Sequence, residues 1–335
     1  MLYIQFVYHT FFIFSKYKNR IYYYIINANI IIYMVDIDIA GDTLQIRTFT
    51  LDMMVEHPAI VMVAKRGSGK SFICRAILYH YNKIPCGIII SETDLYSTFF
   101  GIFFPESFIF YKYKSDILQN VINRQKLMIA KAKRRKAETG KILDTRCLVL
   151  MDDCLADAKS WVRDKPIQDL MFNGRHIKIM YILTMQYPLG VPPNMRVNFD
   201  YIFLMMDDSF INQKKLYEQY AGCFPSFNAF REIFNELTKD FGAMVIINRG
   251  SKPSILEKIY YYKAPNYDGL NDSVKIGCRQ FRTFHEKNYD KEWMAKEMQI
   301  DAEQFMMEKK KSGSKMNVKV VRDKDSEDSN NKKKK

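Results

Sequence analysis

The sequence lacks the cysteine patterns that mark metal-binding or disulfide-rich proteins. Its six cysteines are widely spaced, with no C-x-x-C pair and no histidine at metal-ligand spacing beside them. Because zinc sites and disulfide frameworks both need such patterns, the sequence favours reduced, mostly buried thiols in a cytosol-like compartment. The six are Cys74, Cys86, Cys147, Cys154, Cys223 and Cys278.

Long uninterrupted apolar runs are also missing. Residues 1–33 are crowded with Tyr, Phe and Ile, but the polar stretch 15–20 divides them. Neither half reaches the roughly 20 apolar residues that a membrane-spanning helix needs. The region also lacks the basic start and small-residue cleavage site of a secretory signal. A membrane anchor is therefore not favoured, and we interpret residues 1–33 as an extension that precedes a functional protein opening at Met34.

Acidic residues are scarce relative to basic ones. The chain has 37 Asp and Glu against 51 Lys and Arg, so its formal net charge is +14. Much of the excess lies in the runs at 131–136 and 332–335. Such a balance favours a polyanionic partner, either nucleic acid or a membrane surface. The hydrophobic fraction of 48% is that of a soluble globular protein, and 335 residues leave room for one large α/β domain with attachments or two small domains.

Against these absences stands a phosphate-binding motif. The segment AKRGSGKS, residues 64–71, follows the apolar run 59–63 and precedes the apolar run 72–81. This order predicts a strand, a glycine-bearing turn and a helix, which together form a phosphate loop. The sequence therefore predicts a bound nucleoside triphosphate. The expected binding residues are Arg66, Gly67, Ser68, Gly69, Lys70, Ser71 and Phe72.

Within this motif each residue type has a physical task. Gly67 and Gly69 allow successive backbone N–H groups to turn toward one anion, and Lys70 adds a positive charge for the β- and γ-phosphates. The Ser71 hydroxyl is a ligand for Mg²⁺. Ala64 stands where the usual motif has its first glycine, a change that costs little if Ala64 keeps a negative φ.

Apolar runs elsewhere predict further buried strands separated by helices. This alternation is typical of an α/β fold with a mainly parallel central sheet flanked by helices, in which ligands bind at the carboxyl ends of the strands. Residues 35–52 alternate apolar and polar side chains, as an edge strand or hairpin does. The predicted strands are 59–63, 86–90, 147–153, 177–186, 201–205 and 243–249, with a further one at 107–113.

Helical patterns fill the intervals, and the end of the chain is different in character. We expect a long helix over 115–136 that ends near Gly140, and another over 161–172. The nucleotide-binding domain is predicted to span 34–265, followed by a helical extension over 266–307 that contains an amphipathic helix at 293–307. Residues 308–335 are charged and serine-rich, which predicts a disordered basic tail.

Polar residues follow two of the predicted strands. Asp152 would emerge at the top of a buried strand, where a carboxylate can hold the Mg²⁺ shell opposite Ser71. Asp153 is the candidate for the base that orients the attacking water. Gln186 closes the next strand, and it either senses the γ-phosphate or caps the strand before Pro188.

Basic residues raise two further hypotheses. Arg175, at a turn before the strand 177–186, could stabilise transition-state charge if an adjacent subunit presents it. Arg146, Arg196 and a plain surface role for Arg175 stay open as alternatives, while His176 is interpreted as structural. The basic part of the long helix, 124–136, either faces a nucleic-acid backbone or is a solvated surface.

Taken in order, the segments AKRGSGKS, SETD, CLVLMDD, NGRHIKIMYILTMQ and PPNMRVNFDYIFLM resemble the virion DNA-packaging ATPases of nucleocytoplasmic large DNA viruses, the poxvirus type within the FtsK/HerA superfamily of P-loop NTPases. The resemblance covers residues 51–249. It implies a RecA-like domain that forms a homo-oligomeric ring, hydrolyses ATP with Mg²⁺ and drives double-stranded DNA into a preformed capsid.

Carried over residue by residue, the resemblance makes Lys70 and Ser71 the phosphate and Mg²⁺ ligands and Asp152 the metal support. Asp153 stands where many relatives have glutamate, Gln186 becomes the sensor, and Arg175 becomes the trans-acting finger. The implied partners are DNA and capsid or portal-like virion components, and the implied location is the viral assembly site in the host cytoplasm or the virion. Two alternatives are a nucleotide-dependent assembly scaffold and a P-loop kinase.

Overall fold

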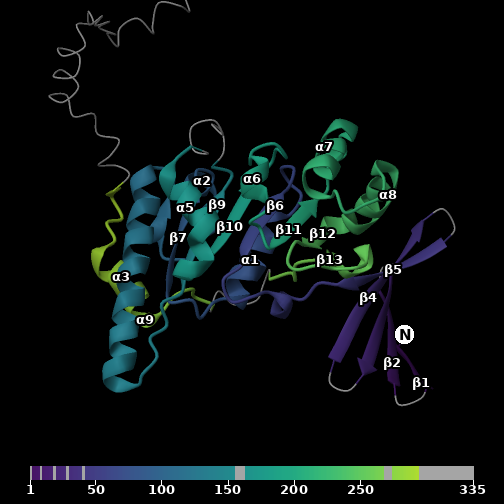
Figure 1. Cartoon of the computed structure of the whole chain (residues 1–335), viewed down its shortest axis with the longest axis horizontal. Coiled ribbons are helices and arrows are strands. Elements are labelled where there is room, and N and C mark those ends of the chain that lie inside the picture. Colours follow the sequence, from purple (N-terminus) through teal and green to yellow (C-terminus); the bar gives the residue numbers. More distant parts are fainter. Residues whose placement is uncertain are drawn as a thin grey trace, which may run out of the picture. The chain divides into compact units, whose positions relative to one another are not determined.

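The computed structural model describes residues 2–7, 10–17, 20–27, 30–39, 42–154, 163–267 and 274–293. The chain divides into two compact units, Met1–Asn288 and Tyr289–Lys335. Its described strands form one sheet in the order β1-β2-β3-β4-β5-β13-β12-β11-β6-β10-β9-β7-β8 (Figure 1).

Six parallel strands form the centre of the sheet. They lie in the order β8-β7-β9-β10-β6-β11, and each pair of neighbours is parallel. Their Val, Ile, Leu and Met side chains are buried almost without exception, as expected for strands covered on both faces. The predicted fold class is therefore confirmed. The strands are β6 (Ala59–Val63), β7 (Cys86–Ser91), β8 (Ile109–Phe110), β9 (Cys147–Asp152), β10 (Ile179–Met185) and β11 (Tyr201–Met205).

Antiparallel strands extend the sheet on the β11 side. Strand β12 (Ala243–Ile247) is antiparallel to β11, and β13 (Ile259–Tyr262) is antiparallel to β12 and parallel to β5 (Asp42–Thr48). The hairpin expected within 35–52 is present, because β4 (Ile30–Ile39) pairs with β5. An antiparallel ladder continues through β3 (Arg20–Asn27), β2 (Thr10–Tyr17) and β1 (Leu2–Val7). A functional start at Met34 stays a prediction.

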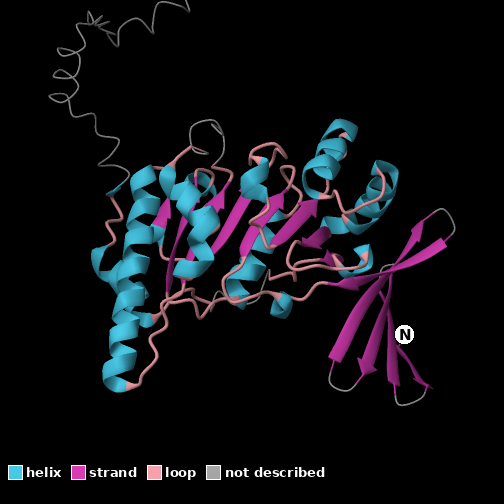
Figure 2. Cartoon of the chain, in the orientation of Figure 1, coloured by secondary structure: helices cyan, strands magenta, loops and turns pink. Residues whose placement is uncertain are grey.

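Helices pack against the sheet and alternate with its strands along the chain (Figure 2). The longer ones are α1 (Lys70–His80), α3 (Ser115–Thr139), α5 (Lys165–Asn173), α7 (Phe210–Tyr220), α8 (Phe227–Leu237) and α9 (Arg279–Asn288), and the short ones are α2 (Asp94–Ser97) and α6 (Pro193–Arg196). Single 3₁₀ turns occupy Leu51–Met53, Glu106–Phe108, Gly174–Ile177, Lys239–Phe241 and Ile255–Glu257.

Most predicted elements agree with the structure. The long helix is α3, which Gly140 ends in a left-handed conformation with its N–H bonded to the carbonyl of Lys136 at 3.0 Å. The strand expected over 107–113 is only the two-residue β8, because a 3₁₀ turn takes Glu106–Phe108. Similarly, the turn Gly174–Ile177 delays the start of β10 to Ile179.

Some predictions concern residues outside the described part. The predicted helix at 293–307 has only Trp293 among the described residues, and the tail 308–335 has none. The predicted limits of the domain, the extension and the tail therefore stay predictions. Across the residues that are described, no helix combines the length and apolar composition required to cross a bilayer.

Candidate nucleotide-binding site

The phosphate loop joins β6 to α1 at the carboxyl edge of the sheet. Gly67 and Gly69 have φ of 79° and 91°, left-handed values that favour glycine. Helix α1 begins at Lys70 with Gly69 as its N-cap, so its first backbone N–H groups face the loop. Ala64 is buried, donates its N–H to the Met185 carbonyl at 2.9 Å, and is not among the described residues with positive φ. Alanine is therefore accommodated at the first position of the motif.

Internal contacts hold the loop in this shape. The Ser68 hydroxyl donates to the Lys65 carbonyl at 2.7 Å, and the Lys65 ammonium lies 2.5 Å from the Asp208 carboxylate. That hydrogen bond lowers the pKa of Asp208 and raises the pKa of Lys65. Since Asp208 follows β11, the exposed pair ties the loop to the neighbouring strand.

Asp152 ends β9 directly beside the loop. It is 3% exposed, and its two carboxylate oxygens accept hydrogen bonds from neighbouring strands. The Thr184 hydroxyl of β10 donates at 2.6 Å and the Ser91 hydroxyl of β7 donates at 3.2 Å. The Lys70 ammonium lies 3.5 Å from the same carboxylate. A buried carboxylate is thus kept in a fixed orientation at the end of its strand.

Asp153 adopts an unusual backbone conformation, with φ of 49°. Its N–H donates to the Thr184 hydroxyl at 3.1 Å, and its carboxylate forms an ion pair with Lys70. The Gln186 amide donates to the same carboxylate at 2.8 Å. The structure therefore brings Lys70, Asp152, Asp153 and Gln186 together at the carboxyl edge, as the sequence predicted. Left-handed non-glycine residues often mark functional sites.

The donor set at this edge fits a hard divalent cation. Ser71 lies in the first turn of α1, one residue after Lys70, and offers a hydroxyl. Asp152 offers carboxylate oxygens, and Mg²⁺ prefers oxygen ligands of both kinds, completed by phosphate oxygens and water. These residues would hold the ion.

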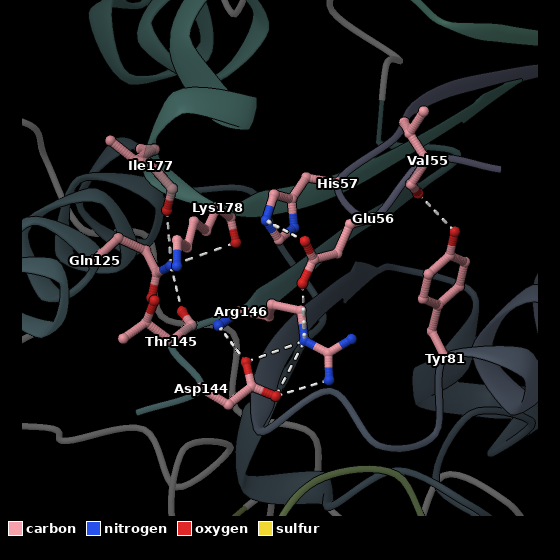
Figure 3. Close-up of polar contacts among 10 residues, drawn as sticks. All are labelled: Val55, Glu56, His57, Tyr81, Gln125, Asp144, Thr145, Arg146, Ile177 and Lys178. Atoms are coloured by element: carbon pink, nitrogen blue, oxygen red, sulfur yellow. Dashed lines mark hydrogen bonds and ion pairs between the residues drawn. The ribbon is translucent and has the colours of Figure 1, made fainter. Parts of the chain in front are cut away.

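The three candidate arginines differ in their surroundings. Arg175 is exposed in the turn before β10, at the amino edge, and so lies away from Lys70 of its own chain. Arg146 is held by Asp144, with its Nε 3.0 Å and its Nη2 2.7 Å from carboxylate oxygens, as Figure 3 shows. Arg196 donates to the Gln219 side chain and lies over the Tyr220 ring at 5.5 Å. Among these three, only Arg175 is without such a holding contact to the described residues.

Sequence reasoning missed the residues that support the aspartates. Ser91 is the only serine or threonine of β7 and Thr184 the only one of β10, in strands that are otherwise largely apolar, which was the available signal. Their role depends on the strand register, which pairs Ser91 and Thr184 with Asp152. His176 is exposed, and within the described ranges no cluster of three or more His, Cys, Asp or Glu residues could hold a metal ion.

Two thiols near the site are largely shielded from solvent. Burial raises the pKa of Cys74 in α1, and burial likewise raises the pKa of Cys154, which donates to the Ile90 carbonyl at 2.9 Å. Because the thiolate is the reactive form of cysteine, a raised pKa disfavours a nucleophilic role for either residue.

Comparison with known proteins decides the family. The sequence profile of the poxvirus A32 protein family matches residues 47–217, which make up half of the chain and include the loop and both aspartates. The chain belongs to the poxvirus A32 protein family. An uncharacterized protein of Acanthamoeba polyphaga mimivirus is 43% identical over 249 residues, covering 74% of this chain and 86% of the relative. An uncharacterized protein of Invertebrate iridescent virus 3 is 33% identical over 257 residues, and the match covers 73% of this chain and 94% of the relative.

Solved structures also resemble this A32-family chain. The genome packaging NTPase B204 from Sulfolobus turreted icosahedral virus 2, in complex with ATP-gammaS, has a TM-score of 0.43 at 15% identity, covering 64% of this chain and 100% of that one. EssC (ATPases 2 and 3) from Geobacillus thermodenitrificans has a TM-score of 0.45 at 13% identity, and the match covers 74% of this chain and 46% of that one.

Family membership confirms the resemblance predicted from the sequence, to the poxvirus-type packaging ATPases. The fold agrees with it. The loop strand β6 and the aspartate strand β9 are separated by β10, so the loop, Gln186 and the aspartates meet at one edge of the parallel sheet of a P-loop domain.

Proposed function

We propose that this A32-family protein is an ATP-hydrolysing motor that moves double-stranded viral DNA into the capsid during virion assembly. The observation that carries the proposal is the constellation at the carboxyl edge. There the phosphate loop, Lys70 and the paired aspartates lie within contact of one another. The motor would act where virions assemble, in the host cytoplasm or within the virion.

Binding of ATP requires Lys70 to exchange partners. In the structure its ammonium pairs with both aspartates. The β- and γ-phosphates of a nucleotide in the loop carry more negative charge and would draw the ammonium toward them. That movement frees the Asp153 carboxylate. Ser71 and Asp152 would hold Mg²⁺, which when bound neutralises charge on the β- and γ-phosphate oxygens.

Hydrolysis then depends on the freed Asp153 carboxylate. As general base it would accept a proton from the water that attacks the γ-phosphorus, while the leaving oxygen departs with ADP. Gln186, already bonded to Asp153 at 2.8 Å, would hold the carboxylate and report whether the γ-phosphate is present. The Asp153 side chain is one methylene shorter than the glutamate of many relatives. The hydrogen bond from Gln186 and the left-handed backbone of Asp153 would together orient its carboxylate toward the attacking water.

A neighbouring subunit of a ring would complete the site. Arg175 lies at the amino edge, where it cannot serve the loop of its own chain but is exposed for contact with another copy. A guanidinium delivered in this way stabilises charge on the transferring phosphoryl group. The proposed site is therefore shared between two protomers.

Double-stranded DNA would bind through basic surface. Helix α3 carries six exposed basic residues in its second half, and phosphate neutralisation supplies most nonspecific DNA affinity. They are Lys126, Lys131, Lys133, Arg134, Arg135 and Lys136.

The proposal is tested by measuring ATP hydrolysis with and without double-stranded DNA. Lys70→Ala and Asp153→Asn should each lower the turnover rate by about 100-fold or more, because each removes a group that acts on the transferring phosphate or the water. The exposed, remote residues Lys83 and Asp116 provide matched controls as Lys83→Ala and Asp116→Asn, which should hydrolyse normally. A rate that neither active-site substitution changes would refute the proposal.

A further inference from the structure

Phe241 lies beside the phosphate loop although it is far away in the sequence. It precedes β12, whose first residue Ala243 pairs with Met205 at the end of β11, next to the loop strand β6. A Cβ placed on Gly69 would meet the Phe241 ring at 3.3 Å and the Met205 methyl group at 3.8 Å. The aromatic ring therefore borders the loop at the position where α1 begins.

The backbone holds Phe241 in a conformation that phenylalanine rarely adopts. Asp240 and Phe241 are consecutive left-handed residues, with φ of 52° and 63°. Gly242 fixes the next step of the chain, since a Cβ there would lie 2.2 Å from the Leu237 carbonyl and 2.8 Å from the Tyr261 ring. Bulky side chains in such conformations persist only where surrounding structure enforces them, and they gather at ligand sites.

The ring is also exposed, although the strands beside it are buried. Phe241 is 64% exposed, whereas Met205 and Ala243 are both at 0%. The ring lies beside Gly69, and most of the residue is open to solvent. Fixed aromatic rings with an open face are the surfaces on which nucleobases stack.

A second exposed aromatic borders the loop, but its ring is already covered. Phe72 follows Ser71 in α1, and the Arg75 guanidinium lies over its ring at 4.8 Å. Phe99 packs against it with the ring centroids 6.1 Å apart. Phe241 has no ring or cation partner among the described residues, so of the two rings it is the one open to a base.

We propose that Phe241 is the stacking platform for the nucleobase of the bound nucleoside triphosphate. With phosphates in the loop, the base would leave on the β11–β12 side and lie against the open face of the ring. Stacking on an aromatic ring tolerates any base, so Phe241 would raise nucleotide affinity without choosing adenine. This inference rests on the proposed nucleotide binding but not on hydrolysis or DNA movement.

The test compares two ligands that differ in the base. Binding of ATP and of inorganic tripolyphosphate, both with Mg²⁺, is measured for the full chain and for variants. Phe241→Ala and Phe241→Asn should weaken ATP binding by about tenfold and leave tripolyphosphate binding unchanged. Phe241→Tyr should keep the affinity for ATP. Phe284→Ala, which removes a remote exposed ring, should leave the affinities for both ligands unchanged.

Phe241→Asn also separates stacking from folding. Asparagine tolerates left-handed φ, so this variant should melt at the wild-type temperature or above it while binding ATP more weakly. The inference is overturned if ATP affinity is unchanged in Phe241→Ala, or if ATP and tripolyphosphate weaken equally. A wild-type chain that binds neither ligand would overturn the proposed function itself.

Discussion

Thr184 connects the two aspartates through one hydroxyl group. It donates to the Asp152 carboxylate at 2.6 Å and accepts from the Asp153 N–H at 3.1 Å. The same side chain thus orients the proposed metal ligand and stabilises the left-handed backbone of the proposed base. Groups that position catalytic residues in this way affect turnover more than substrate binding.

Replacing Thr184 with valine should lower kcat for ATP by about 10- to 100-fold, with a smaller change in KM. The reason is that the Asp153 N–H loses its acceptor and the Asp152 carboxylate loses a donor. The buried N–H should also destabilise the fold by about 1–3 kcal/mol, measured by denaturant unfolding. Thr184→Ser keeps the hydroxyl and is the control. Equal kcat values for the valine and serine variants would count against a positioning role.

At the level of residues, sequence reasoning found the chemistry but not its supports. Lys70, Asp152 and Gln186 were predictable because each begins, ends or directly follows an element whose polarity pattern is clear. Ser91, Thr184 and Phe241 were not, because their roles depend on strand register and on a chain reversal after α8. The sequence also did not separate Arg175 from the other two candidate arginines. In the structure Asp144 binds Arg146 and Gln219 binds Arg196.

Helix α3 has two halves with different roles. The first half packs on the body through Leu118, Val121 and Ile122, and through Gln125, whose amide donates to the Thr145 and Ile177 carbonyls at 2.8 Å. Figure 3 shows this anchor. No residue of the helix is buried beyond Gln125, and Figure 1 shows this end extending past the strands. The second half is therefore available to a partner without cost to the core.

Replacing four basic residues of this half with glutamine should reduce the salt dependence of DNA binding. The plot of log K against log salt concentration has a negative slope, and each lost phosphate contact makes that slope shallower by about 0.9. We expect the magnitude of this negative slope to decrease by at least about 2. Affinity at fixed salt should fall by about tenfold, measured by fluorescence anisotropy. ATP hydrolysis without DNA should not change. The variant combines Lys131→Gln, Lys133→Gln, Arg134→Gln and Arg135→Gln.

A matched variant changes four exposed lysines elsewhere on the body to glutamine. Its DNA binding should keep most of the salt dependence of the wild-type protein. If both quadruple variants lose affinity equally, then general charge rather than α3 binds the DNA. The control residues are Lys83, Lys214, Lys263 and Lys287.

At the level of elements, buried parallel strands were easiest to predict. Strands β6 and β11 match their predicted bounds because uninterrupted apolar runs have sharp ends. Helices α7 and α8 and strand β13 were missed. Helix α8 carries a clear signal in hindsight, with Ser226 accepting from the Ala229 N–H and Phe230 and Phe234 on its buried face. Strand β13 is only four residues, too short for a period to show.

The whole molecule has its proposed catalytic groups at opposite edges of one sheet. The loop and aspartates lie at the carboxyl edge, and Arg175 lies before β10 at the amino edge. This separation suits a ring, in which the amino edge of one protomer meets the carboxyl edge of the next.

Mixing two inactive variants tests the shared site. Arg175→Ala lacks the proposed finger and Asp153→Asn lacks the proposed base, so each alone should hydrolyse ATP poorly. When the two are mixed, some interfaces combine an intact Asp153 with an intact Arg175 from the neighbour, and part of the activity should return. A mixture of the active control variant Lys83→Ala with Asp153→Asn measures how much activity remains when active subunits are diluted with inactive ones. Absence of rescue at every mixing ratio would indicate a role for Arg175 within its own chain.

If the protein is a motor, ATP hydrolysis moves it along double-stranded DNA. The most direct measurement is displacement of a third strand, a labelled oligonucleotide bound as a triplex at a fixed distance along a duplex. The wild-type protein should release it only with Mg²⁺ and ATP, after a delay that grows with the distance travelled, and Lys70→Ala should release none. Hydrolysis of ATP without any displacement, or displacement that needs no ATP, would contradict the motor.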